Sequence, residues 1–288
     1  MPTIATHSGP FHADDVFAVA LLRRFWSRDA TVVRTRDKAR IAACDCVVDV
    51  GALYDPASLR FDHHQSTYEG QLSSAGMVLV WLRESATIPV ELASHLCTSA
   101  VEYIDAVDTG RHAPKAGIPC FPRIIESLNA LASTEEEFDG VFLRAVDLAG
   151  TWLDGMVVDH ERVQASAAEV RAAMADADRK GTNLLEFPAY ISWKPGYFAN
   201  GGESHPTEFV LFPGTDATWR IIAIPPRDGE FGQKVSLPES WAGLTDASLE
   251  AVTGVPGSMF CHKNRFIAVF KTREGAVEGL RRSGLLRG

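Results

Sequence analysis

Short apolar runs alternate with helical patterns over the first part of the chain. The expected elements are a helix at 14–26 and strands at 3–5, 30–35, 46–50 and 59–62. The helix carries apolar residues over most of its surface, so we expect it to be buried. Strands that alternate with helices are typical of a parallel sheet. The N-terminal part is therefore expected to be an α/β domain.

Helical periodicity dominates the middle of the chain. One helix is expected at 90–107, and 119–131 is expected to be a short, turn-rich link. The run Thr134-Glu135-Glu136-Glu137 resembles a capping box, which marks the start of a helix. We expect that helix to run to about residue 178, with a break at Gly150 or Gly155.

Strand signals return after Gly181-Thr182-Asn183, which ends the helical section. The expected strands are 184–187, 208–212, 219–225, 259–262 and 266–270. This change of pattern predicts two domains, 1–181 and 182–288. The second is the smaller and is expected to be a mixed α/β domain. We expect the active site in the cleft between the two.

Composition and charge narrow the class of protein. Hydrophobic residues make up 46% of the 288, enough for an ordinary globular core. The formal net charge of −9 argues against a protein that coats nucleic acid with a broad basic face. It does not exclude an enzyme that holds a nucleic-acid end at a metal site, because bound ions supply local positive charge. No apolar run is long enough to span a membrane, and the N-terminus lacks a signal-peptide pattern. We expect a cytoplasmic protein without a membrane partner.

Histidine and aspartate residues recur where an expected strand or helix ends. The candidates are His7, His12, Asp14, Asp49, His63, Asp105 and Asp108. Strand ends of this kind converge on one crevice in an open α/β sheet. Imidazole and carboxylate ligands without thiolate suit Mn, Mg, Co or Fe better than a closed structural zinc site. Because there are too many candidates for one ion, we expect two divalent ions, most simply Mn²⁺, with Asp49 as the bridge.

Several phrases in the same order resemble the DHH phosphoesterase superfamily. They are His…His-x-Asp (7–14), Val-Asp-Val-Gly (48–51), Phe-Asp-His-His-Gln (61–65) and Asp-x-x-Asp (105–108). Four fuller phrases narrow the resemblance: Thr-His-Ser-Gly-Pro-Phe-His-Ala-Asp (6–14), Arg-Phe-Asp-His-His-Gln (60–65), Leu-Pro-Glu-Ser-Trp-Ala-Gly-Leu (237–244) and Thr-Arg-Glu-Gly-Ala (272–276). Taken together they are similar, more narrowly, to the MYG (melanocyte proliferating gene) family of DHH-like proteins. The resemblance runs from about residue 3 to about residue 280.

The resemblance implies a role for each candidate ligand. His7, His12 and Asp49 would hold one ion. The second ion would be held by Asp14, Asp49, His63 and either Asp108 or Asp105. Asp108 is favoured of the last two, because it precedes Thr-Gly as in other DHH enzymes.

The remaining site residues are assigned to catalysis and substrate binding. His64 would contact a phosphate or act as a general acid, and Asp62 would orient a ligand imidazole from behind. In the second domain, Lys263 and Arg265 flank an expected hairpin turn. Arg273 follows Thr272, a candidate N-cap, and could grip a phosphate with two bonds or simply form an ion pair. The family's Gly-Gly-His stretch is replaced here by Ala268-Val269-Phe270.

The leading hypothesis is a metal-dependent phosphodiester hydrolase in which two metal ions activate a water. Its substrate would be RNA or a short oligonucleotide, which it would shorten as an exonuclease. An alternative with the same metal site is the hydrolysis of a small phosphate compound, such as pyrophosphate or a dinucleotide. A third is a non-catalytic metal-binding protein on the same frame. The sequence is compatible with a homodimer.

Overall fold

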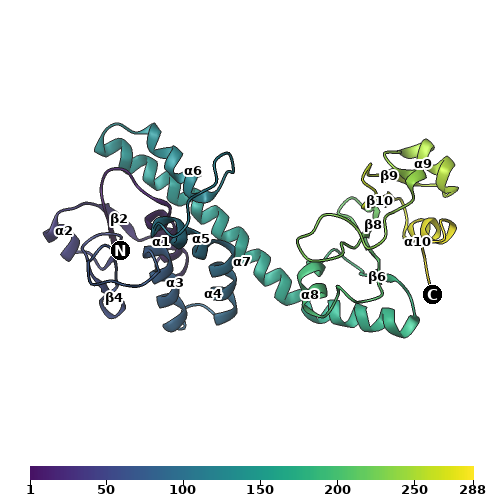
Figure 1. Cartoon of the computed structure of the whole chain (residues 1–288), viewed down its shortest axis with the longest axis horizontal. Helices are drawn as coiled ribbons and strands as arrows, with labels where there is room; N and C mark the ends of the chain where they lie inside the picture. Colours follow the sequence, from purple (N-terminus) through teal and green to yellow (C-terminus); the bar gives the residue numbers. More distant parts are fainter. The chain divides into compact units, whose positions relative to one another are not determined.

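A computed structural model describes all 288 residues and shows an α/β protein with two five-stranded sheets (Figure 1). The chain forms two compact units, Met1–His160 and Glu161–Gly288. The units divide inside a long helix, whereas the sequence predicted the division at 181/182, where that helix ends. The C-terminal part of the helix groups with the second unit because Val170 and Met174 pack in a core with Tyr197.

The sheet of the first unit is parallel except at one edge. Its strands are β1 (Thr3–Thr6), β2 (Thr31–Arg34), β3 (Cys46–Val48), β4 (Tyr54–Asp55) and β5 (Arg60–Phe61), in the order β2-β1-β3-β5-β4. Only β4 is antiparallel to its neighbour. The four expected strands and their parallel arrangement are therefore confirmed, and β4 is an addition that the sequence did not predict.

Both faces of this sheet are covered, which explains the near-continuous apolar strands. Ile4 belongs to the main core, whereas its neighbour Ala5 packs on the opposite face with Ile41. Successive side chains of a strand point to opposite faces, so β1 contributes to both cores.

The helices of the first unit are α1 (Ala13–Phe25), α2 (Lys38–Ala42), α3 (Ser74–Glu84), α4 (Val90–Leu96), α5 (Glu102–Asp108) and α6 (Phe121–Leu128). A π-helical turn at Cys97–Val101 joins α4 to α5, so the expected helix over 90–107 is confirmed with a local irregularity. The expectation of a turn-rich link at 119–131 is wrong. Most of that segment is α6, with Pro122 in its first turn, where proline is tolerated.

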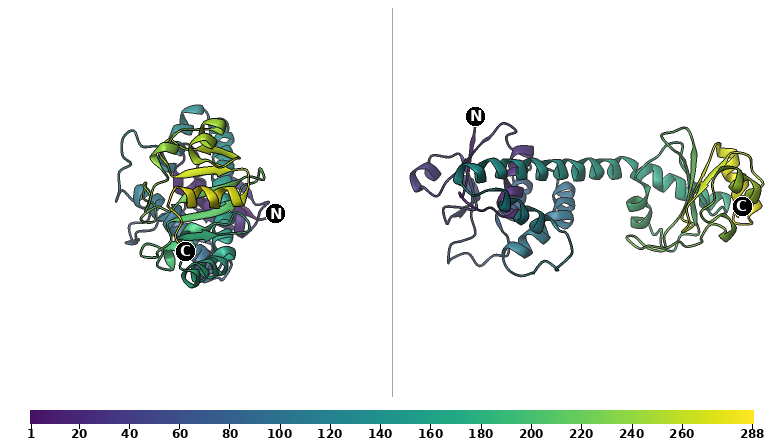
Figure 2. Two further views of the ribbon diagram at one scale, coloured as in Figure 1. Left: turned by 90° about the vertical axis from the view of Figure 1, so that its right-hand side faces the viewer. Right: turned by 90° about the horizontal axis from the view of Figure 1, so that it is seen from above.

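The long helix α7 (Glu135–Lys180) runs without a break (Figure 2). The predicted interruption at Gly150 or Gly155 is therefore wrong. Glycine in a helix interior costs about 0.5–1 kcal/mol relative to alanine, yet it keeps its backbone hydrogen bonds. Buried neighbours such as Ala149 and Leu153 stabilise this part of the helix. The capping box is confirmed, because the Thr134 N–H donates to the Glu137 carboxylate at 3.1 Å and the Glu137 N–H donates to the Thr134 hydroxyl at 3.3 Å.

The second unit contains a mixed sheet with helices packed on it. Its strands are β6 (Leu184–Glu186), β7 (Phe209–Pro213), β8 (Trp219–Ala223), β9 (Ser258–Cys261) and β10 (Ile267–Phe270), in the order β6-β7-β8-β10-β9. Its shorter helices are α8 (Trp193–Ala199), α9 (Asp246–Thr253) and α10 (Arg273–Arg282). All five strands match those expected. No helix of the structure combines the length and apolar character needed to cross a membrane.

Candidate metal centre

The carboxyl edge of the first sheet carries most of the predicted site residues. His7 directly follows β1, Asp49 follows β3, and Asp62 to His64 follow β5. These three strands are neighbours and parallel, so their last residues meet at one edge. The start of α1 brings His12 and Asp14 to the same place, and the end of α5 brings Asp108.

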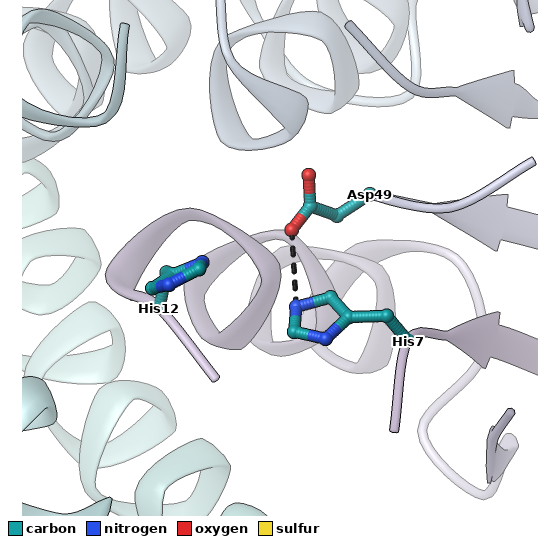
Figure 3. Close-up of side chains that lie close together, drawn as sticks. All are labelled: His7, His12 and Asp49. Atoms are coloured by element: carbon teal, nitrogen blue, oxygen red, sulfur yellow. Dashed lines mark ion pairs between the residues drawn. The ribbon is translucent and has the colours of Figure 1, made fainter. Parts of the chain in front are cut away.

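Asp49 lies between the buried imidazole of His7 and the partly buried imidazole of His63, with one oxygen toward each. Its Oδ2 is 3.3 Å from Nε2 of His7, and its Oδ1 is 3.3 Å from Nε2 of His63. Figure 3 shows the first of these contacts, with His12 beside it at the start of α1. The Ser74 hydroxyl also donates to Oδ1 of Asp49, at 3.3 Å. This arrangement is what a carboxylate needs to be shared between two cations.

The backbone after β3 adopts a conformation that is rare for side chains other than glycine. Asp49 has φ 55°, and Ala52 has φ 53° three residues later. Aspartate tolerates this left-handed region better than most residues, whereas alanine there is strained by roughly 1–2 kcal/mol. The Ala52 N–H donates to Oδ2 of Asp62 at 2.5 Å, which holds the turn against β5. The strained turn aims the Asp49 carboxylate into the site.

The His and Asp side chains form overlapping groups whose ligand atoms lie within 4.8 Å of one another. The groups are His7/His12/Asp49, Asp49/His63/His64, His12/Asp14/Asp108 and Asp14/Asp15/Asp49. His63 Nε2 is 3.2 Å from Oδ2 of Asp108 and 4.0 Å from Oδ2 of Asp14. The predicted set for the first ion is one of these groups, and the predicted set for the second ion surrounds His63.

Three buried atoms in this cluster have no hydrogen-bond partner: His7 Nε2, His63 Nε2 and Asp14 Oδ1. A buried polar atom without a partner is costly, so each of them needs a ligand. All three are atoms that bind divalent metals. The donor set and its unpaired atoms therefore fit one or more divalent metal ions.

The electrostatics also call for a cation. Burial raises the pKa of Asp14, and the nearby carboxylates of Asp49 and Asp108 raise it further. Burial by itself lowers the pKa of His7, but Asp15 and Asp49 outweigh it and raise the value to about 10. Without a metal, the raised pKa values of Asp14 and His7 mean that these side chains hold protons more tightly than usual. A metal would compete with those protons for the same atoms.

His64 and Asp62 form a pair beside the cluster. Asp62 is 1% exposed and accepts from the His64 backbone N–H at 3.1 Å, while its Oδ1 is 2.8 Å from His64 Nδ1. The His64 side chain is 60% exposed. The sequence predicts that Asp62 orients a ligand imidazole from behind, and the imidazole it contacts in the structure is that of His64.

Asp105 lies outside every group of candidate ligands. Its Oδ1 accepts from the backbone N–H and hydroxyl of Ser73, at 3.0 and 2.6 Å, and from the Gly76 N–H at 3.1 Å. Asp105 therefore holds the N-terminus of α3, and α3 in turn places Ser74 against Asp49. Of the two alternatives left open by the sequence, Asp108 is the one that the fold places among the candidate ligands.

Three residues that support the site were not predicted. Asp15 lies 3.3 Å from His7 Nε2 and accepts from the His12 N–H at 3.0 Å. The Asn129 side chain bonds both backbone groups of Phe11. Arg34 donates to the Gly9 carbonyl at 2.6 Å. Asp15 had a detectable signal, because an acidic residue three positions after a helix N-cap can bond that cap. Asn129 and Arg34 had none, since their contacts are distant in sequence.

Two cavities open on the cluster of candidate metal ligands, and His12 and His64 line both. The first, of about 730 Å³, extends from His7 and Asp49 past α2. The second, of about 600 Å³, is lined by His63, Asp108 and residues of α6. A ligand in either cavity would contact the cluster.

The predicted substrate contacts Lys263, Arg265 and Arg273 belong to the second unit. Lys263 and Arg265 lie in the turn between β9 and β10, as expected. Thr272 caps α10 by accepting from the Gly275 N–H at 3.1 Å. The Arg273 guanidinium forms a two-bond ion pair with Glu186. The guanidinium of Arg273 therefore already donates to the Glu186 carboxylate.

The stretch at 268–270 is part of the second core. Ala268 and Phe270 are fully buried and alternate with the partly exposed Val269 along β10. The Phe270 ring packs edge-on against Trp241. These apolar side chains stabilise the sheet and leave no polar group at the positions where the family is expected to have histidine.

Comparison with known proteins covers almost the whole chain. Residues 3–283 match the family model MYG1_exonuc, described as an uncharacterised protein family (UPF0160). A "MYG1 protein" of Chlamydia muridarum is 38% identical over 283 residues, which cover 96% of this chain and 95% of that protein. A "MYG1 exonuclease" of Homo sapiens is 32% identical over 316 aligned positions, covering 96% of this chain and 84% of that protein.

Proposed function

Because the chain belongs to the MYG1 family, we propose that it is a metal-dependent phosphodiester hydrolase, an exonuclease that acts on RNA or oligonucleotide ends. The observation that carries the proposal is the position of Asp49, with one oxygen 3.3 Å from His7 and the other 3.3 Å from His63. The name of the human relative, MYG1 exonuclease, supports the class of substrate.

In this proposal the site would hold two divalent ions. His7, His12 and Asp49 would hold the first ion, and Asp14, Asp49, His63 and Asp108 would hold the second. Divalent ions held there would supply positive charge for the phosphoryl oxygens and a water of lowered pKa as the nucleophile. Mn²⁺ is the first metal to test, followed by Mg²⁺ and Co²⁺.

His64 is assigned the proton that the leaving oxygen requires. With Nδ1 directed at Asp62, Nε2 is the nitrogen left to face a substrate. The carboxylate of Asp62 orients the ring, as in other carboxylate–histidine pairs. In the second unit, Lys263, Arg265 and Arg273 are proposed to contact substrate phosphates, with residues 182–288 acting as the substrate-binding part.

The experiment is hydrolysis of a short end-labelled RNA by protein stripped of metal with a chelator, followed by addition of Mn²⁺, Mg²⁺ or Co²⁺. Stepwise shortening that depends on added metal is the expected result, and labelling each end in turn gives the polarity. A matched DNA strand tests the preference for RNA.

Two outcomes would replace the proposal. Cleavage of pyrophosphate or a dinucleotide without any shortening of longer RNA would identify a hydrolase of small phosphate compounds. Tight metal binding without hydrolysis of any phosphate ester would identify a non-catalytic metal-binding protein.

A further inference from the structure

The 730 Å³ cavity has two chemically different walls. One wall is formed by the candidate metal ligands His7, His12 and Asp49. Another is apolar and includes Ile41, Val47, Val50 and Leu53. Leu53 is 49% exposed, although most large apolar side chains of this unit are buried. The volume lies within the range of about 300–1,000 Å³ that is usual for small-ligand sites.

Arg36 and Lys38 line the same cavity and carry its accessible positive charge. Both are exposed, and neither forms an ion pair with a carboxylate. Arg60 also lines the cavity, but its guanidinium donates to the carbonyl oxygens of Cys44, Asp45 and Ser58. In a chain with a net charge of −9, two unpaired cations beside a metal-binding cluster favour an anionic ligand.

The contact of Arg36 with His7 links this charge to the metal-binding cluster. His7 Nδ1 is 3.2 Å from the Ser8 carbonyl oxygen and 3.2 Å from an Arg36 guanidinium nitrogen. The two neighbours demand opposite tautomers, because the carbonyl needs an N–H and the guanidinium needs a lone pair. When Nε2 of His7 binds a cation, Nδ1 keeps its hydrogen and donates to Ser8. Arg36 is then without an acceptor and is available to a phosphate.

From this cavity we infer a binding site for the nucleoside monophosphate unit next to the bond that is cut, with its phosphate toward Arg36 and Lys38 and its base against Val50 and Leu53. A nucleotide suits both parts of the cavity. The apolar faces of its base fit the apolar wall, and its phosphate, which is separated from the base by the sugar, fits the two cations. Inorganic phosphate would use only the cations. The inference rests on the proposed function, because it takes the ligand to be a nucleic-acid end.

The test is equilibrium binding of mononucleotides, which the enzyme does not need to turn over. Adenosine 5′-monophosphate and adenosine 3′-monophosphate are titrated by calorimetry into wild type and variants with Mn²⁺ present, and adenosine and inorganic phosphate serve as fragments. The variants are Lys38→Gln and Leu53→Asp, at two exposed positions where folding is not at risk.

Two controls match these substitutions outside the cavity. Arg40→Gln removes a positive charge from the same helix, and Val90→Asp adds an acid at an apolar residue that is 59% exposed. Neither position lines either cavity. We expect Lys38→Gln and Leu53→Asp each to weaken mononucleotide binding by about tenfold or more, with both controls near wild type. Adenosine and inorganic phosphate should each bind more weakly than the mononucleotide.

Equal affinity in wild type, Lys38→Gln and Leu53→Asp would overturn the inference. The absence of mononucleotide binding by wild type would do the same, as would phosphate that binds as tightly as the mononucleotide. RNA hydrolysis by wild type is measured separately. If wild type hydrolyses RNA and the variants bind mononucleotide like wild type, the proposed binding site is rejected and the proposed nuclease function is retained. The expected binding pattern without hydrolysis of any ester would retain the cavity and reject the nuclease.

Discussion

Oδ1 of Asp62 lies 2.8 Å from Nδ1 of His64, so the carboxylate sets which nitrogen of the imidazole faces outward. The other oxygen of Asp62 accepts from Ala52 and thereby secures the strained turn that carries Asp49. A single buried aspartate thus supports both the candidate proton donor and the candidate bridging ligand.

Replacing His64 with alanine is expected to lower kcat by about 10²- to 10⁴-fold, the usual range for loss of a general acid. Metal content should stay near that of wild type, because His64 is the proton donor in our assignment. Both are measured on the same preparation, by RNA hydrolysis and by metal analysis after dialysis. Loss of metal from His64→Ala would show that the roles of His63 and His64 are exchanged.

Asp49→Ala is expected to lower activity by about 10³-fold or more and to reduce the bound metal, because a shared carboxylate serves both ions. Asp49→Asn separates charge from conformation, since asparagine also tolerates a positive φ. It should fold like wild type and still lose activity. Asp154→Ala, at an exposed aspartate paired with Arg24, is the control. Full metal content in Asp49→Asn would argue against the bridging role.

The stability of the protein should respond to pH through Asp105. Burial raises the pKa of this carboxyl to about 6, against the opposing effect of its bonds from Ser73 and Gly76. Because folding favours the neutral Asp105 carboxyl, its contribution to the free energy of unfolding is fully present below about pH 4. That contribution is lost as the pH rises through about 6. The side chain at position 105 of Asp105→Asn does not ionise. Between pH 4 and pH 7 the free energy of unfolding of this variant should therefore rise by up to about 3 kcal/mol relative to that of wild type.

Urea unfolding of both proteins at several pH values measures this difference, with chelator present to exclude metal effects. Gly76→Ala is a companion variant, because a Cβ at position 76 would overlap the Asp105 carboxylate. It should destabilise the protein at every pH. A pH-independent difference between wild type and Asp105→Asn would contradict the raised pKa.

Arg273 and Glu186 should act on substrate binding in opposite directions. If the Arg273 fork contacts a phosphate, Arg273→Ala raises KM several-fold with little change in kcat. Glu186→Ala should lower KM, because it frees the guanidinium from its two-bond ion pair. Steady-state kinetics on a short RNA gives both values. Unchanged KM in both variants would restrict Arg273 to the ion pair with Glu186.

Local patterns in the sequence were sufficient to predict much of this protein. Alternating strands and helices predicted the parallel sheet of the first unit and all five strands of the second. The same reasoning placed His7, Asp49 and His63 together, because each follows a strand and parallel strands end at one edge. The capping residues Thr134 and Thr272 were also found, since the side chain of a cap accepts from a backbone N–H only three residues away.

Tertiary structure decided what the local pattern left open. Asp105 and Asp108 are three residues apart on one helical face, so the sequence could not separate them. The fold places the first against Ser73 and Gly76 and the second against His63. Likewise, Gly150 does not interrupt α7, although its sequence allows a break. In each case the deciding contacts join residues that are distant along the chain, and local periodicity carries no information about them.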